Sequence, residues 1–243
     1  MFPNGLANGS GLVGRNLMLH PYARVEGQFP DPLGFFVPDE IAGIVSFAFQ
    51  KTIPERGFLR GSKLQVNAGP GPLDIATGKI TKKPLPWGNS HHKEFEKQFD
   101  HFCGITICAE DLPEYKNCIN LSKKIKDKDN LPVAKINYKV SKNSRRILDF
   151  GIKRAEELLK EAGAIRTYSN PLLSQAGFHL MGTARMGKDP KSSVVDPQGR
   201  CHEIDNLFIA DSSVFVTSSV SNPTATAQAL ALRSAEIVCK QLD

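Results

Sequence analysis

Hydrophobic and polar residues alternate most regularly in the middle of the chain. Between residues 134 and 140, apolar side chains occupy every second position, with lysine or asparagine between them. A period of two predicts a β-strand with one face in water. Two shorter apolar runs, at residues 105–107 and 118–121, are further strand candidates. An earlier apolar patch at residues 41–49 predicts a buried strand or a short helix.

The period then changes to that of a helix. Apolar residues recur at spacings of three and four, at Leu148, Ile152, Ala155, Leu159 and Ala162. Such spacing predicts a helix with one apolar face. Ser144 can cap its first turn, and Gly163 can end it. The middle of the chain therefore predicts a sheet with a helix packed on it.

The C-terminal part combines a short strand with a long helix. Residues 206–211 have a wholly apolar centre and end in an acid, which predicts a buried strand. A loop of small residues, 212–221, leads to Asn222 and Pro223. Pro223 suits the first position of a helix and Asn222 can cap it. The first half of this helix is apolar nearly all round, which predicts that it is buried.

Composition and charge limit the classes of protein that the chain can represent. Its 243 residues can form one large domain or two small ones, and 40% hydrophobic with 23% charged residues is typical of a globular protein. The net charge is +6, and the basic residues are spread along the chain as short groups, at residues 82–83, 123–128 and 145–146, without interleaved aromatic residues. These groups indicate solvated faces, so no nucleic-acid partner is expected. No apolar run reaches the length of a membrane span.

The five cysteines form an odd, scattered set. This pattern argues against a disulfide scaffold and favours reduced thiols. The chain also opens without a basic and then apolar leader. Together these observations predict a cytoplasmic protein.

Three local patterns imitate binding sites without the context that such sites need. Residues 9–14 match GxGxxG, but no strand precedes them, so we expect no dinucleotide site there. Residues 182–188 imitate a P-loop, but Asp189 replaces the hydroxyl residue that would hold magnesium, and Pro190 disfavours a following helix. The histidines and cysteines of residues 91–108 lack the spacing of a zinc site. No metal is therefore expected.

The last 65 residues carry a succession of four motifs. They are His179-Leu-Met-Gly-Thr-Ala-Arg-Met-Gly187, Val194-Val-Asp196, Asn206-Leu-Phe-Ile-Ala-Asp-Ser-Ser213 and Asn222-Pro-Thr-Ala-Thr226. In order and spacing they resemble the C-terminal signature of the glucose–methanol–choline (GMC) oxidoreductases, flavoenzymes that oxidise alcohols. More loosely, residues 110–121 and the helix after Ser141 resemble the family's substrate domain. Residues 6–18 resemble the segment after its cofactor domain.

The resemblance implies an α/β protein in three parts. Residues 1–25 would be a remnant of the FAD-binding domain. Residues 26–175 would form an α+β substrate domain, an antiparallel or mixed sheet with packed helices. Residues 176–243 would carry the catalytic residues and return to a Rossmann-like FAD-binding domain as a strand, loop and helix. The family's N-terminal flavin-binding unit is expected to be absent.

The resemblance also implies the residues of the site. Oxidation of an alcohol needs a base for the hydroxyl proton while hydride leaves the same carbon, and a histidine titrates near neutral pH. His179 holds that place in the family pattern, and Asn222 lies opposite it. An amide hydrogen-bonds the substrate oxygen but is no base, so His179 would act alone. The residues that would contact the flavin of FAD are Asp211, Ser212, Pro223 and Thr224.

The implied function is oxidation of the CH–OH group of an alcohol, sugar or polyol, with hydride transfer to flavin N5. The electron acceptor would be oxygen, a quinone or a cytochrome. A second interpretation is a noncatalytic fragment or binding module derived from such an enzyme. His20 and His202 are expected to be structural.

Overall fold

The computed structural model describes residues 5–34 and 43–242. Two compact units, each built from separated segments, make up the chain. They are a sheet unit of Pro21–Glu110 and Lys142–Ala176, and a loop unit of Met1–His20, Asp111–Ser141 and Gly177–Asp243. The functional domain boundaries that the sequence suggests stay a prediction.

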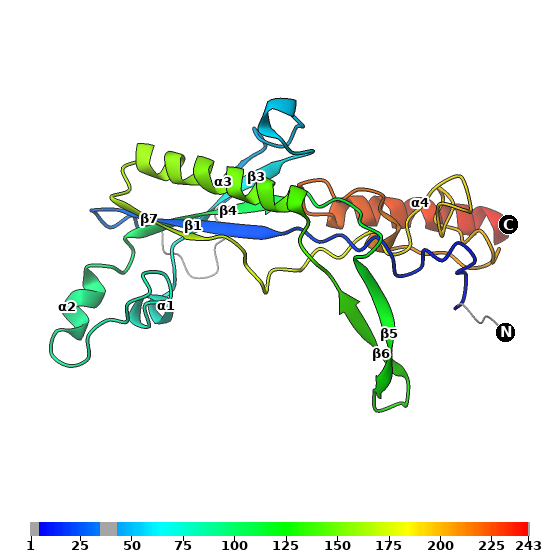
Figure 1. Cartoon of the computed structure of the whole chain (residues 1–243), viewed down its shortest axis with the longest axis horizontal. Coiled ribbons are helices and arrows are strands. Elements are labelled where there is room, and N and C mark those ends of the chain that lie inside the picture. The colour runs from blue at the N-terminus through cyan, green and yellow to red at the C-terminus, as the bar shows by residue number, and fades with distance from the viewer. Residues whose placement is uncertain (1–4, 35–42, 243) are drawn as a thin grey trace. The chain divides into compact units, whose positions relative to one another are not determined.

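The sheet unit contains a five-stranded antiparallel sheet in the order β2-β3-β4-β1-β7. Its strands are β1 (Tyr22–Gln28), β2 (Val45–Ser46), β3 (Ser62–Ala68), β4 (Phe102–Ala109) and β7 (Arg166–Asn170). Helix α3 (Lys142–Glu161) packs along β1 and β4 (Figure 1). The predicted antiparallel or mixed sheet with packed helices is therefore confirmed, and it is antiparallel. Of the strand candidates in the middle of the chain, it contains residues 105–107, whereas residues 118–121 and 134–140 lie outside it.

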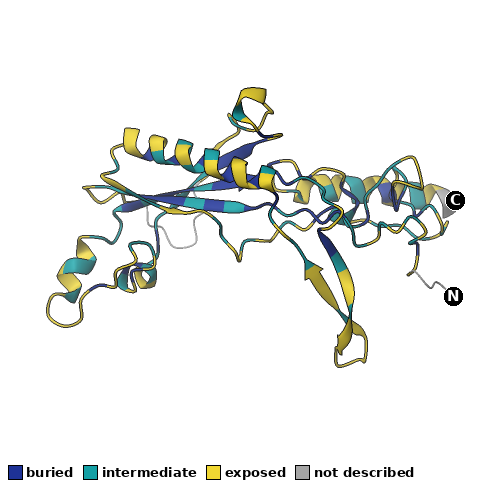
Figure 2. Ribbon diagram, viewed as in Figure 1, coloured by how far each residue is buried: buried dark blue, intermediate teal, exposed yellow. Residues whose placement is uncertain are grey.

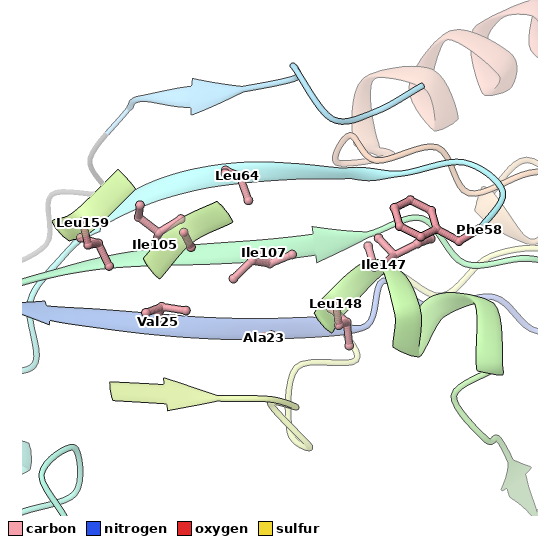
Figure 3. Close-up of a cluster of buried hydrophobic side chains, with 11 residues drawn as sticks. Ala23, Val25, Phe58, Leu64, Ile105, Ile107, Ile147, Leu148 and Leu159 are labelled. Carbon is pink, nitrogen blue, oxygen red and sulfur yellow. The ribbon is translucent and has the colours of Figure 1, made fainter. Parts of the chain in front are cut away.

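The core of this unit lies between α3 and the sheet. Alternate residues of β1 and β4 meet one face of the helix, whose outer face is exposed (Figures 2 and 3). The side chains of this cluster are Ala23, Val25, Phe58, Leu64, Ile105, Ile107, Ala109, Ile147, Leu148, Ala155 and Leu159. Gly151 lets the helix approach closely, because a Cβ there would lie 2.5 Å from Cγ2 of Ile107. Ser144 is buried inside the helix, so its predicted role as the cap is wrong.

Among the described residues of the sheet unit there are also three short helices and a second core cluster. The helices are η1 (Pro54–Arg56), α1 (Pro72–Ala76) and α2 (His91–Glu96). Ile75, Leu85 and Phe102 form the second cluster. The buried element predicted at residues 41–49 is wrong for its described part, because Ile44 is 65% exposed. There β2 is a two-residue edge strand that pairs with β3 alone; residues 41 and 42 lie outside the described chain.

In the loop unit, β5 (Cys118–Lys126) and β6 (Pro132–Asn137) form a two-stranded ribbon. Both strands were predicted, but Ala134 and Ile136 are exposed, so the predicted dry face of β6 is wrong (Figure 2). A two-stranded ribbon buries a face only where another layer covers it.

The C-terminal part of the loop unit contains η2 (Ser212–Val214) and α4 (Thr224–Leu242). The strand predicted at residues 206–211 is reduced to a single bridge, between Arg200 and Phe208. The predicted long helix is present, but only a stripe including Ala227 and Leu230 packs on a core, and Leu232 is 67% exposed. Its predicted burial all round is therefore wrong. Apolar composition alone does not bury a helix, because burial needs a neighbouring surface on each side.

All five cysteines are free thiols. Across residues 5–34 and 43–242, no helix combines the length and the apolar character needed to cross a membrane.

Candidate active site

A single backbone bridge brings two distant histidines together. Met18 and Met181 exchange hydrogen bonds, with N···O distances of 2.9 and 3.0 Å, in an antiparallel arrangement. In an antiparallel pair, the residue two positions after one partner faces the residue two positions before the other, on the same side. His20 and His179 occupy those positions, and their Nδ1 atoms lie 2.7 Å apart. The sequence did not predict this contact, because His20 was assigned a structural role.

Gly182 makes the close approach of these segments possible. Its φ of +89° lies in the left-handed region, and a Cβ there would lie 2.6 Å from the Asn16 carbonyl oxygen. The amides that a P-loop would offer to phosphate serve the fold: those of Ala184 and Met186 donate to the carbonyls of Ser213 and Val214.

The GxGxxG segment also serves backbone packing. Residues 9–14 lie in turns rather than between a strand and a helix. The Gly14 amide donates to Thr183 at 2.8 Å, and its carbonyl accepts from the Ile119 amide at 2.8 Å. A side chain on Gly14 would collide with the Ile119 carbonyl oxygen. Gly14 thus allows a close contact between segments.

Asn222 contacts the other side of the His179 ring. Its Nδ2 lies 3.4 Å from Nε2 of His179. Helix α4 begins just beyond, one residue later than predicted, and the Ala227 amide donates to the Pro223 carbonyl at 2.9 Å. Pro223 therefore precedes the first helical residue, Thr224. The imidazole of His179 lies between His20 at Nδ1 and Asn222 at Nε2.

A cavity of about 440 Å³ adjoins this cluster. Five of the six predicted site residues line it: His179, Asp211, Ser212, Pro223 and Thr224. Asn222 completes the set through its contact with His179. The structure thus brings all six together, although their catalytic and binding roles stay a prediction.

Two of these residues also shape the cavity wall. Asp211 accepts the Ser213 amide at 2.7 Å and so caps η2. The Ser212 hydroxyl donates to the Leu180 carbonyl at 2.6 Å, which ties η2 to the segment that carries His179.

The lining of this cavity combines apolar side chains with the N-terminal end of a helix. Phe178, Leu180, Ala210, Ala227 and Ala231 provide apolar surface. The first turn of α4 presents backbone N–H groups without intrahelical partners, together with the positive end of the helix dipole. A reduced flavin has a largely apolar ring system and negative charge near N1, so the residues present fit the flavin end of FAD.

A second cavity, of about 580 Å³, lies in the sheet unit, and the sequence suggested none of its residues. Arg24 and Glu26 line it, because they alternate along β1 with the core residues Ala23 and Val25. Arg24 Nε lies 2.5 Å from Glu26 Oε1. Burial raises the pKa of Glu26, and Arg24 opposes that shift.

Comparisons with known proteins show what this chain is similar to. Residues 113–231 match the family model described as GMC oxidoreductase. The chain is 34% identical to 2-methyl-1,2-propanediol dehydrogenase of Mycolicibacterium austroafricanum, covering 98% of the chain and 44% of that protein. It is 29% identical to the fructose dehydrogenase large subunit of Gluconobacter japonicus, covering 99% and 43%. It therefore spans less than half the length of these relatives.

Among solved structures, formate oxidase of Aspergillus oryzae RIB40 aligns with a TM-score of 0.55 over 96% of this chain and 48% of that one. At 16% identity, this similarity shows the fold alone. The chain belongs to the GMC oxidoreductases, a family of FAD-binding flavoproteins. The predicted family and fold class are confirmed.

Proposed function

We propose that this chain forms the catalytic part of an FAD-dependent oxidoreductase that oxidises the CH–OH group of an alcohol, sugar or polyol. The position of His179 carries the proposal: its Nε2 faces Asn222, and its side chain lines a cavity beside the N-terminus of α4. The relatives named for a propanediol and for fructose support a hydroxylated substrate.

His179 and Asn222 together complement an alcohol hydroxyl. A hydroxyl donates one hydrogen bond and accepts others, so an oxygen near both side chains can donate to Nε2 of His179 and accept from the Asn222 amide. With these two atoms 3.4 Å apart, one oxygen can lie within hydrogen-bond distance of each. His179 then removes the hydroxyl proton, and Asn222 orients the oxygen.

When bound, FAD supplies the hydride acceptor at flavin N5. Asp211, Ser212, Pro223 and Thr224 would hold the flavin, since all four line the cavity. The first turn of α4 would stabilise negative charge there through its N–H groups and the helix dipole. Oxygen, a quinone or a cytochrome would then accept the electrons.

The test uses the FAD-loaded holoenzyme, in which this chain is joined to the family's N-terminal flavin-binding unit. It is anaerobic stopped-flow reduction by a panel containing 2-methyl-1,2-propanediol, fructose and a long-chain alcohol. At least one member should reduce the flavin. His179→Ala should slow that step by roughly 10²–10⁴, equal to about 3–5 kcal/mol of barrier, with the flavin content unchanged.

His202→Ala is the matched control. His202 lies in the same unit and bonds the Ser193 hydroxyl at 2.8 Å, so its loss should leave the rate unchanged. An unimpaired His179→Ala variant would overturn the role of His179. A flavin that no alcohol reduces would instead favour the noncatalytic binding module.

A further inference from the structure

We propose that His20 is a positioning residue that fixes the tautomer of His179, so that the lone pair of neutral His179 lies on Nε2. The inference rests on the proposed function, because it assigns the atom of His179 that takes the substrate proton. It follows from the hydrogen bonds that His20 makes to two backbone carbonyl groups and to His179.

The backbone around His20 determines which of its ring nitrogens carries the proton. Its Nε2 lies 2.9 Å from the Ser219 carbonyl oxygen and 3.2 Å from that of Ser218. Carbonyl oxygens only accept hydrogen bonds, so Nε2 of His20 must carry a hydrogen. His20 is 1% exposed, and burial favours the neutral form of an imidazole. A neutral ring with hydrogen on Nε2 has its lone pair on Nδ1.

The position of the proton on His20 fixes the position of the proton on His179. The two Nδ1 atoms are 2.7 Å apart, so one of them donates to the other. Because Nδ1 of His20 is the acceptor, Nδ1 of His179 carries the hydrogen. Neutral His179 then has its lone pair on Nε2. The Asn222 amide, a donor 3.4 Å from Nε2, is consistent with this assignment.

The protein holds the two carbonyl groups in place. The buried Ser218 hydroxyl accepts the Asp111 amide at 2.9 Å and donates to the Asp111 carbonyl at 3.0 Å. Ser219 has a φ of +56°, a left-handed conformation that non-glycine residues rarely adopt. Such strain persists where the surroundings enforce it, and here the Ser219 carbonyl oxygen contacts His20.

Other ionisable groups adjoin this cluster. The Asp111 carboxylate accepts the amide of Leu19 at 3.2 Å and the hydroxyl of Tyr138 at 2.7 Å. Burial, followed by the charge of Asp111, raises the pKa of Tyr138, so Tyr138 stays a neutral donor at physiological pH. The Asp111 carboxylate thus has two hydrogen-bond donors of its own.

The arrangement also helps His179 after it accepts the proton. The imidazolium of His179 keeps the hydrogen bond from its Nδ1–H to Nδ1 of His20. The two carbonyl groups that accept from Nε2 of His20 increase the electron density on Nδ1 of His20, which makes it a stronger acceptor. An acceptor on the far nitrogen of a catalytic histidine acts likewise in serine proteases, where the wrong tautomer costs about 10⁴ in rate. Loss of His20 should therefore lower the pKa of His179 and release its ring.

The test compares His20→Phe with His20→Asn in the FAD-loaded protein. Phenylalanine fills the space but offers no acceptor, whereas the asparagine amide can place an oxygen near Nδ1 of His179. Flavin reduction in His20→Phe should slow roughly 10²–10⁴-fold, as for other losses of a histidine's partner, and His20→Asn should recover part of it. In His20→Phe the acid limb of the rate–pH profile should shift to lower pH, which a purely structural defect would not cause. His202→Phe is the control.

A second measurement avoids variants altogether. Nitrogen-15 NMR of histidine-labelled wild-type protein distinguishes the tautomers, and neutral His179 should show a protonated Nδ1 and an unprotonated Nε2. The reverse tautomer, or a His20→Phe variant with wild-type rate and pH limb, would overturn the role of His20. If His179→Ala leaves flavin reduction unchanged, the proposed function fails first. If that variant is slow while His179 shows the reverse tautomer, only the role of His20 fails.

Discussion

The sheet unit and the loop unit hold their residues in place by different means. In the sheet unit, continuous ladders join five strands, and α3 covers one face through a single apolar cluster. In the loop unit, the candidate site depends on isolated bridges, glycine-permitted close contacts and buried side-chain bonds. A regular unit spreads its stability over many similar contacts. The loop unit has an apolar cluster of its own, which includes Met18 and Met181, but the alignment of its site residues depends on a few specific contacts. Changes at those contacts should therefore affect chemistry more than unfolding.

The largest effect on folding should come from the sheet unit. Ile107 is fully buried between β4 and α3, so Ile107→Ala should lower the free energy of unfolding by about 2–5 kcal/mol. Ile125, which is 63% exposed on the ribbon, is the control, and Ile125→Ala should change it by less than about 0.5 kcal/mol. Urea unfolding measures the free energy of unfolding of both variants. Equal effects would mean that the core is not where the structure puts it.

Gly182→Ala tests the contact in the loop unit that aligns the two histidines. A methyl group would strain a φ of +89° and press on the Asn16 carbonyl, weakening the Met18–Met181 bridge that aligns the two histidines. We expect a stability loss of about 1–3 kcal/mol and a larger proportional loss in the rate of flavin reduction. Gly177→Ala is the control, because its methyl group would make an ordinary 3.4 Å contact with Leu19. A stability loss without a rate loss would contradict the proposed role of the bridge.

Asn222 tests the electrostatics of the site. An ionised Asn222→Asp side chain would repel both a developing alkoxide and the negative charge of a reduced flavin. Flavin reduction should therefore be about tenfold slower in Asn222→Asp than in Asn222→Ser, which removes the amide without adding charge. Stopped-flow measurement at one saturating alcohol concentration compares the two. Equal rates would leave Asn222 with a structural role only.

The smallest effect should be the pH dependence of stability at Glu26. Its pKa in the folded protein is raised, chiefly by burial, so the folded state binds this proton more tightly than the unfolded chain does. Wild-type stability should therefore fall as the pH rises from the unfolded pKa through the folded one. Glu26→Gln should lack this loss, so its melting temperature relative to wild type should rise between pH 4 and pH 8. Glu157→Gln, at an exposed pair with Arg154, should show no such trend.

The parts that sequence could predict are those governed by local periodicity. The spacing of Leu148, Ala155 and Leu159 predicted α3 and its buried face, because helical geometry alone places these residues together. The apolar runs of β4 and β5 also predicted strands. The same reasoning was wrong for the burial of β6 and α4, because whether a face is covered depends on neighbours that periodicity does not specify.

The candidate site was predictable as a set of residues but not as an arrangement. The resemblance identified His179, Asn222 and the four residues beside the cavity, and the structure brings them together. It did not identify His20, which lies 159 positions from His179. The available signal was the pair of segments Leu17-Met-Leu-His20 and His179-Leu-Met181, in which methionine and histidine occur two residues apart in opposite order. That symmetry becomes meaningful only once the antiparallel bridge is known.

The pH dependence of flavin reduction tests most directly whether His179 takes the substrate proton. In the FAD-loaded wild-type protein, the rate constant should fall on the acid side as one group becomes protonated, because only neutral His179 can act as the base. In His179→Ala the rate should be low and should lack this limb. A variant that keeps the wild-type acid limb would show that another group is the base.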